Sequence, residues 1–191
     1  MEYINKQIKK EELLGLPGVG KSYILENRFG NNKESIELGF NLNKIRNIIS
    51  GLNLFPLSIV FKMLFNIKKG KIKGGIKLIL VLLERAGRIK LSKNNIIIDE
   101  GVCQALWGYM IRTKLDYDLV HNILIILKKV AVNVHYVMIS KRKHKEYLKK
   151  RKNENKYKFN NEKDLIIARN KMAILLNLMK KNKFKINKIN N

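Results

Sequence analysis

The sequence predicts an α/β domain built on a mainly parallel sheet. Two apolar runs rich in β-branched residues, 96–98 and 132–139, have the composition of strands that are buried on both faces. Segments with apolar residues at helical spacing lie before, between and after them. Strands that alternate with helices favour a parallel sheet, and such sheets bind ligands at the carboxyl ends of their strands.

Length and composition are typical of one folded domain. The chain has 191 residues, of which 46% are hydrophobic and 29% are charged. A chain of this length can bury most of its apolar surface in one core, so we expect residues 1–191 to form a single domain. The lone Cys103 cannot form an intramolecular disulfide, and the charged residues 1–12 lack the apolar run of a signal peptide. We therefore expect a cytoplasmic protein.

The amino-terminal elements flank a glycine-rich loop. Leu13 and Leu14 precede the loop, but residues 9–12 read Lys-Lys-Glu-Glu where a buried strand would carry apolar side chains. The first strand is therefore predicted to be very short or atypical. Residues 22–28 are predicted as a helix that ends before Gly30.

Two amphipathic helices are predicted next, over residues 45–52 and 57–65, with a break at Pro56. Together they have the length of a membrane span. The stretch is interrupted by polar residues and a proline, namely Arg46, Asn47, Asn53, Pro56 and Lys62. We therefore predict no transmembrane segment here, and a segment that docks on a membrane surface is the alternative.

The rest of the chain continues the alternation. Helices are predicted over residues 76–86, 102–112, 116–130, 141–152 and 162–181. The strand at 96–98 follows the first of these helices, and the strand at 132–139 leads directly into the basic helix at 141–152. A short last strand is predicted over residues 184–189.

The loop after Leu14 carries the strongest functional signal. Its sequence satisfies the phosphate-loop pattern G-x-x-x-x-G-K-[ST], with Gly15, Leu16, Pro17, Gly18, Val19, Gly20, Lys21 and Ser22. In this pattern the glycines let backbone N–H groups surround a polyphosphate at the start of a helix. Lys21 is predicted to reach the β- and γ-phosphates, and the Ser22 hydroxyl to bind Mg²⁺. The simpler interpretation is a glycine-rich turn before a helix.

An acid after the 96–98 strand complements the loop. A phosphate loop needs a carboxylate at the end of a neighbouring strand to hold Mg²⁺, and Asp99 stands at that position. Glu100 is a candidate for orienting a water or an acceptor hydroxyl, although a solvated acid at a strand end is nearly as plausible.

The basic helix at 141–152 supplies candidate cations for catalysis. Phosphoryl transfer spreads negative charge over the moving group, and enzymes often bring arginine onto it from a mobile segment. Arg142 and Arg151 are the candidates. A solvated lysine-rich face, or a surface for nucleic acid or acidic lipid, are the alternatives.

These motifs together resemble those of the P-loop kinases of small molecules, the thymidylate kinase-like and adenylate kinase-like group. The resemblance implies a three-layer P-loop NTPase fold with about five mainly parallel strands. It implies ATP with Mg²⁺ at residues 15–22 and an acceptor site under the helices of residues 43–88. It also implies a lid over residues 141–158. The acceptor would be a nucleotide or another small molecule.

The high positive charge leaves a second function open. The formal charge is +25, which is typical of proteins that bind a phosphate backbone. Of the 40 basic residues 32 are lysine, and asparagine and isoleucine are also abundant, which indicates a compositional bias of AT-rich codons. We therefore predict an ATP-dependent phosphotransferase. The alternatives are an ATPase or nucleotide-dependent switch that binds nucleic acid, and a nucleotide-binding protein without turnover.

Several other residues are expected to be structural. His121, His135 and His144 show no metal-ligand spacing, and Cys103 is expected in the core. Trp107 and Tyr109 follow the Asp99 strand and are expected to be core residues more than acceptor contacts. Arg85 and Arg88 could hold an acceptor phosphate, but capping of the helix end is the plainer account.

Overall fold

The computed structural model describes residues 9–29, 42–68, 72–93, 95–114, 116–130, 132–153 and 162–191. The strands are β1 (Lys10–Leu14), β2 (Ile96–Ile98), β3 (Val132–Met138) and β4 (Ile186–Asn190). The helices are α1 (Lys21–Phe29), α2 (Leu42–Leu52), α3 (Leu57–Phe65), α4 (Ile72–Leu91), α5 (Val102–Arg112), α6 (Tyr117–Lys128), α7 (Lys141–Asn153) and α8 (Glu162–Lys181).

The strands form one parallel sheet in the order β2-β1-β3-β4. The predicted α/β class with a parallel sheet is confirmed. The described part of the chain contains four strands, so the expectation of about five is corrected there. β2, β3 and β4 correspond to strand-like runs in the sequence and β1 to the weak first strand, whereas the fifth strand was implied by the family resemblance alone.

β1 lies in the middle of the sheet and is longer than predicted. It pairs with β2 through residues 10–12 and with β3 through residues 10–14. The sequence signal was weak because Glu12 occupies a central strand position that is fully buried. A buried carboxylate requires hydrogen-bond partners, and α5 supplies them, as described below.

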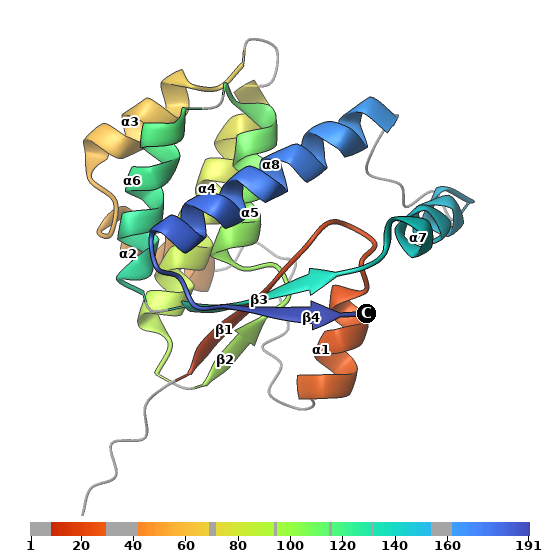
Figure 1. Cartoon of the computed structure of the whole chain (residues 1–191). Helices are drawn as coiled ribbons and strands as arrows, with labels where there is room; N and C mark the ends of the chain where they lie inside the picture. Colours follow the sequence, from red (N-terminus) through yellow and green to blue (C-terminus); the bar gives the residue numbers. More distant parts are fainter. Residues whose placement is uncertain are drawn as a thin grey trace, which may run out of the picture.

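Helices cover both sides of the sheet (Figure 1). In that view α1 lies on one side, and α4, α5 and α8 lie on the other. The buried side chains of the sheet and the helices belong to one hydrophobic cluster. Trp107 and Tyr109 are part of it, and their polar atoms donate hydrogen bonds to the backbone oxygens of Ala168 and Met63. The prediction that these aromatics are core residues is confirmed.

α4 is longer than predicted and packs closely against α2. The predicted range 76–86 stopped at Gly87, but the helix continues, and Ile89 is buried. A Cβ atom at Gly87 would collide with the backbone oxygen of Asn47, and one at Gly51 with that of Leu83. Gly87 therefore serves helix packing and does not end the helix.

No single helix of the described residues is long and apolar enough to cross a bilayer. α2 with α3 reaches that length only as a pair bent by 102°.

Candidate phosphate-binding site

The glycine-rich loop connects the carboxyl end of β1 to the start of α1. Gly18 and Gly20 have φ angles of 83° and 84°, in the left-handed region that favours glycine. The two glycines flank one residue, and left-handed residues in such a turn can direct backbone N–H groups toward a common point, which is a geometry that binds anions. The first N–H groups of α1 have no acceptor within the helix, so they add to the same positive field. Both features are compatible with an anion bound at the loop.

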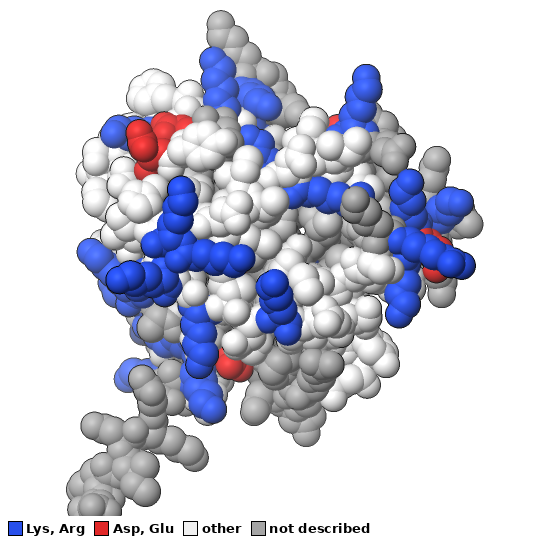
Figure 2. All heavy atoms as spheres, in the orientation of Figure 1, with Lys and Arg blue, Asp and Glu red and all other residues white. Residues whose placement is uncertain are grey.

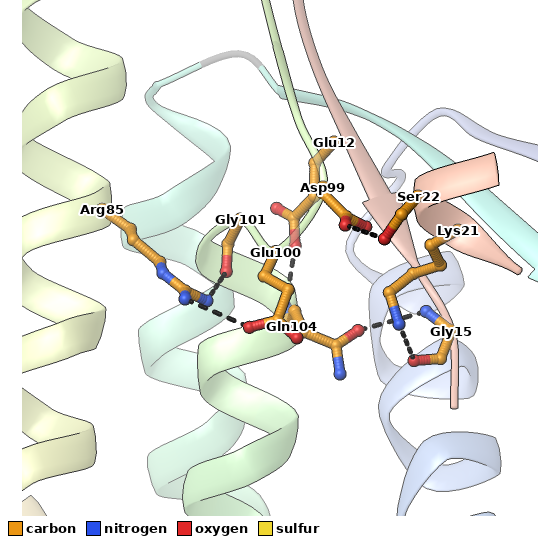
Figure 3. A network of polar contacts seen from close by, with 9 residues as sticks. All are labelled: Glu12, Gly15, Lys21, Ser22, Arg85, Asp99, Glu100, Gly101 and Gln104. Carbon is orange, nitrogen blue, oxygen red and sulfur yellow. Dashed lines mark hydrogen bonds and ion pairs between the residues drawn. The ribbon is translucent and has the colours of Figure 1, made fainter. Parts of the chain in front are cut away.

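Lys21 lies within the loop and is buried. Its Nζ donates a hydrogen bond to the backbone oxygen of Gly15 at 3.1 Å (Figure 3) and a second one to that of Leu16 at 3.4 Å. These are neutral acceptors, so anionic phosphate oxygens would bind the ammonium more strongly. The arrangement holds the positive charge of Lys21 beside the loop.

Ser22 and Asp99 come together although 77 residues separate them. The Ser22 hydroxyl donates to Asp99 Oδ2 at 2.7 Å. The other carboxylate oxygen, Asp99 Oδ1, is buried and has no hydrogen-bond partner among the described residues. A buried oxygen without a donor is unfavourable unless a cation or a water occupies the space beside it. The hydroxyl and the carboxylate therefore fit Mg²⁺, which prefers oxygen ligands and keeps several of its waters.

Glu12 and Gln104 hold the loop against α5. Glu12 accepts hydrogen bonds from the backbone N–H groups of Cys103, at 3.0 Å, and Gln104, at 2.7 Å, and so caps the start of α5. The Gln104 side chain in turn accepts a hydrogen bond from Gly15 N at 3.1 Å. Burial raises the pKa of the Glu12 carboxyl, while the two N–H groups and the Arg85 charge oppose that rise. Its two hydrogen bonds hold the start of α5 against β1.

Arg85 fixes the turn that follows Asp99. Its guanidinium donates to Gly101 O at 3.1 Å and to Glu100 Oε2 at 3.5 Å (Figure 3). This side chain comes from the last third of α4 and reaches the β2–α5 connection. Arg85 therefore holds Glu100, which directly follows Asp99 in the sequence.

His144 connects the basic helix α7 to the phosphate loop. Its Nε2–H donates to Pro17 O at 3.0 Å, and its Nδ1 accepts from Arg169 of α8 at 3.1 Å. A carbonyl only accepts and a guanidinium only donates, so the two partners fix the neutral tautomer with the proton on Nε2. Burial lowers the pKa of His144, the bond to Pro17 O opposes this, and the charges of Arg169 and Lys21 lower it further.

This geometry predicts acid-dependent stability. The folded state holds His144 neutral and lowers its pKa below the ordinary 6.5 of the unfolded chain. At a pH between the folded-state pKa and 6.5, the unfolded chain therefore binds more protons than the folded protein. We expect the His144 contribution to the free energy of unfolding to be present above pH 6.5 and to be lost as pH falls through the folded-state pKa. Chemical denaturation of wild type and His144→Gln from pH 8 to pH 5 measures it.

The control for this experiment is His121→Gln, because His121 is exposed and its Nδ1 contacts Asn182. The stability difference between wild type and His144→Gln should shrink toward acid pH, and His121→Gln reports the effect of losing an exposed imidazole. A constant difference for His144→Gln would contradict the assigned tautomer.

The other residues predicted for the site contribute only backbone oxygens, point to solvent, or lie outside the described residues. Pro17 and Val19 contribute backbone oxygens, which accept from His144 and from the side chain of Asn191, the latter at 2.8 Å. Arg142 points to solvent, with 91% of its side chain exposed, and its Nε donates to Glu146 at 3.3 Å. The side chain of Arg151 and residues 154–158 of the predicted lid lie outside the described residues.

Sequence reasoning missed the residues that support the loop. Glu12, Gln104 and His144 contact it from positions without a motif, and His144 was expected to be an isolated structural histidine. One signal was available for Glu12. An acid in the middle of a strand that precedes a phosphate loop must be buried and paired, because that strand is central to the sheet.

No protein-family model matches this chain, and a search of the curated proteins finds no match.

Proposed function

We propose that the chain binds ATP with Mg²⁺ at residues 15–22 and transfers the γ-phosphoryl group to a small-molecule acceptor. The observation that carries the proposal is the contact of Ser22 with Asp99, which joins the end of the phosphate loop to the end of the neighbouring strand. A glycine-rich turn with no ligand gives no reason for this pairing. It also does not account for the buried ammonium of Lys21 inside the loop.

Each residue has a distinct role in this proposal. The N–H groups of the loop bind the phosphates, and Lys21 exchanges its carbonyl partners for phosphate oxygens. Ser22 and Asp99 hold Mg²⁺, which when bound neutralises charge on the phosphates. Glu100, steadied by Arg85, orients the acceptor. During transfer a bond forms between the acceptor oxygen and the γ-phosphorus, the bond to the β–γ bridging oxygen breaks, and ADP leaves.

In this proposal the helices of residues 43–88 bind the acceptor, and the basic helix α7 supplies positive charge to the transferred group. The acceptor would bind beside the helices of residues 43–88, from which Arg85 already reaches the loop region. Arg142, and Arg151 from the same helix, would approach the transferred group if α7 moved toward the loop. His144 anchors this helix to the loop at Pro17 O.

The decisive experiment is a transfer screen with Mg-ATP labelled at the γ-phosphate. Nucleoside monophosphates, nucleosides and sugars are offered as acceptors, and labelled product is separated from free phosphate. We expect one acceptor class to be labelled by the wild type and not by Lys21→Ala. Release of free phosphate that does not depend on the acceptor would indicate an ATPase. Tight ATP binding without either product would indicate a protein that binds nucleotide without turnover.

Exposed basic residues on α7 favour the second candidate, an ATPase or switch that binds nucleic acid. They are Arg142, Lys143, Lys145 and Lys149. Figure 2 shows blue side chains over this helix, at the right of the view. Backbone binding through these residues would weaken steeply with salt. A titration of DNA and RNA at 50 and 200 mM salt, with and without ATP, distinguishes this candidate from the kinase.

The magnesium assignment predicts a specific effect of Asp99→Asn. Asparagine keeps an oxygen that accepts from Ser22 but removes the negative charge that attracts the cation. We expect the Mg²⁺-dependent gain in ATP affinity to fall at least tenfold, with metal-free ATP binding unchanged or slightly stronger. Calorimetric titration with and without Mg²⁺ measures both. Asp118→Asn, a solvent-exposed change of the same charge, is the control, and equal behaviour of the two variants would exclude Asp99 as a ligand.

A further inference from the structure

Two carbonyl groups of the phosphate loop are held by side chains from distant elements. Pro17 O accepts a hydrogen bond from His144 Nε2 at 3.0 Å, and Val19 O accepts one from Asn191 Nδ2 at 2.8 Å. His144 lies in α7, and its Nδ1 accepts from Arg169 of α8 at 3.1 Å. Asn191 directly follows β4, and its backbone N–H donates to the end of β3. Both donors are therefore fixed to the fold by contacts outside the loop.

Each held carbonyl fixes the direction of the N–H group that follows it. No peptide bond in the described residues is cis. In a trans peptide the C=O and N–H groups lie in one plane and point in opposite directions. The carbonyl of Pro17 is held on one side of the chain, so the N–H of Gly18 points to the other side. The carbonyl of Val19 directs the N–H of Gly20 in the same way.

These two N–H groups have no acceptor within the described residues. The N–H of Val19, which lies between them, donates to Leu16 O at 3.4 Å. Neither Gly18 N nor Gly20 N donates to an oxygen of the described residues. Both glycines are partly exposed, so an external acceptor can reach them. Gly20 leaves no room for a side chain, because a Cβ atom there would collide with Asn191 Nδ2.

We propose that His144 and Asn191 are positioning residues, which orient two N–H groups of the loop toward bound phosphate oxygens. The two groups belong to Gly18 and Gly20. This inference rests on the proposed phosphate site and assigns the orientation of its donors to side chains outside the motif. N–H groups that are already oriented bind an anion without the entropy cost of ordering the loop. Arg169 supports this role, because it fixes the tautomer whose Nε2–H faces the loop.

Calorimetric titration of the full chain with magnesium tripolyphosphate tests the proposal. This probe carries the phosphates of ATP without base or sugar, so it reports on the loop alone. We expect Asn191→Leu and His144→Leu each to weaken binding about tenfold, through the loss of one well-oriented hydrogen bond to a charged group. His144→Gln keeps an N–H donor for Pro17 O and should bind within about threefold of wild type. Thermal unfolding confirms that each variant is folded during the titration.

Asn182→Leu is the matched control for Asn191→Leu. Asn182 is buried, and its Nδ2 also donates to a backbone oxygen, that of Leu178 at 2.8 Å, but its bonds go to α8 and His121 instead of the loop. This variant should bind tripolyphosphate like wild type. Equal losses in the two asparagine variants would assign the effect to reduced stability and overturn the proposal. Equal losses in His144→Gln and His144→Leu would overturn the role of the His144 N–H group.

Lys21→Ala separates this proposal from the phosphate site itself. If Lys21→Ala weakens tripolyphosphate binding and both leucine variants of the positioning residues bind like wild type, the site stands and the positioning roles are overturned. If the wild type does not bind the probe, the site and the positioning roles are both overturned.

A second measurement uses the wild type alone. In nuclear magnetic resonance spectra of glycine-labelled protein, tripolyphosphate should shift the amide signals of Gly18 and Gly20 most strongly. Gly108 lies within α5 and is the internal control. Shifts at Gly108 as large as those at Gly18 and Gly20 would overturn the proposal.

Discussion

Replacing Lys21 with alanine is expected to weaken Mg-ATP binding about a hundredfold. The ammonium is buried in the loop and held by the carbonyl oxygens of Gly15 and Leu16, so it is already positioned for phosphate oxygens. A hydrogen bond to a charged group contributes about 1.5–3 kcal/mol, and each 1.4 kcal/mol corresponds to a factor of ten in affinity. Isothermal titration calorimetry with Mg-ATP measures the loss.

Lys143→Ala is the control for Lys21→Ala. It removes the same charge from an exposed position next to His144, which contacts the loop. Long-range attraction to this site is screened at physiological salt, so the control should bind within about twofold of wild type. Equal affinities for wild type and Lys21→Ala would contradict a phosphate-binding loop. Equal losses in both variants would show that the effect comes from overall charge.

Replacing Gly101 with alanine is expected to lower the free energy of unfolding by about 2–4 kcal/mol, combining overpacking with a weakened helix cap. A Cβ atom at this position would lie 2.6 Å from both Cγ and Oε2 of Glu12. Glu12 is fully buried and fixed by the N–H groups of Cys103 and Gln104, so it has no free direction in which to move. Urea denaturation measures the change. ATP affinity should fall as well, because Gln104 holds Gly15 N.

Gly108→Ala is the matched control on the same helix. There a Cβ atom meets only Leu78, at 3.4 Å, which is ordinary contact. Alanine is a better helix former than glycine by about 0.5–1 kcal/mol, so this variant should be unchanged or more stable. Similar stabilities of the two variants would show that Glu12 can shift away from Gly101.

The sequence predicted the parts of this site whose chemistry requires fixed spacing. The loop from Gly15 to Ser22 and the acid at Asp99 follow from local patterns. The residue spacing of the loop and the end of a strand can each be recognised within a few neighbouring residues. The alternation of strands and helices was sufficient for the α/β class and for most helix bounds. The full length of β1 was not predictable from hydrophobicity, because a glutamate is expected at the surface. Glu12 is buried only because backbone N–H groups of α5, far away in the sequence, donate hydrogen bonds to it.

The contacts that support the loop could not be read from short patterns. His144 and Arg169 meet only because α7 and α8 pack beside the loop, and Arg85 reaches Gly101 only because α4 passes the end of β2. The arginine roles were predicted from the negative charge that phosphoryl transfer develops and from the basic helix that follows the 132–139 strand, and the structure leaves Arg142 on the surface. Side-chain direction on an exposed helix depends on tertiary packing, and the sequence of a lysine-rich helix carries little information about it.

The hydrogen bonds that hold the glycine-rich loop join positions far apart in the sequence, and we expect them to form late in folding. Gly15, Pro17 and Val19 are bonded to Gln104, His144 and Asn191, which lie 89, 127 and 172 positions away along the chain. Contacts between such distant positions form slowly, because a large loop entropy must be overcome before they contribute stability. We therefore expect the loop to reach its native conformation only after β3 and β4 have joined the sheet. During refolding, recovery of nucleotide binding should coincide with the slowest structural phase.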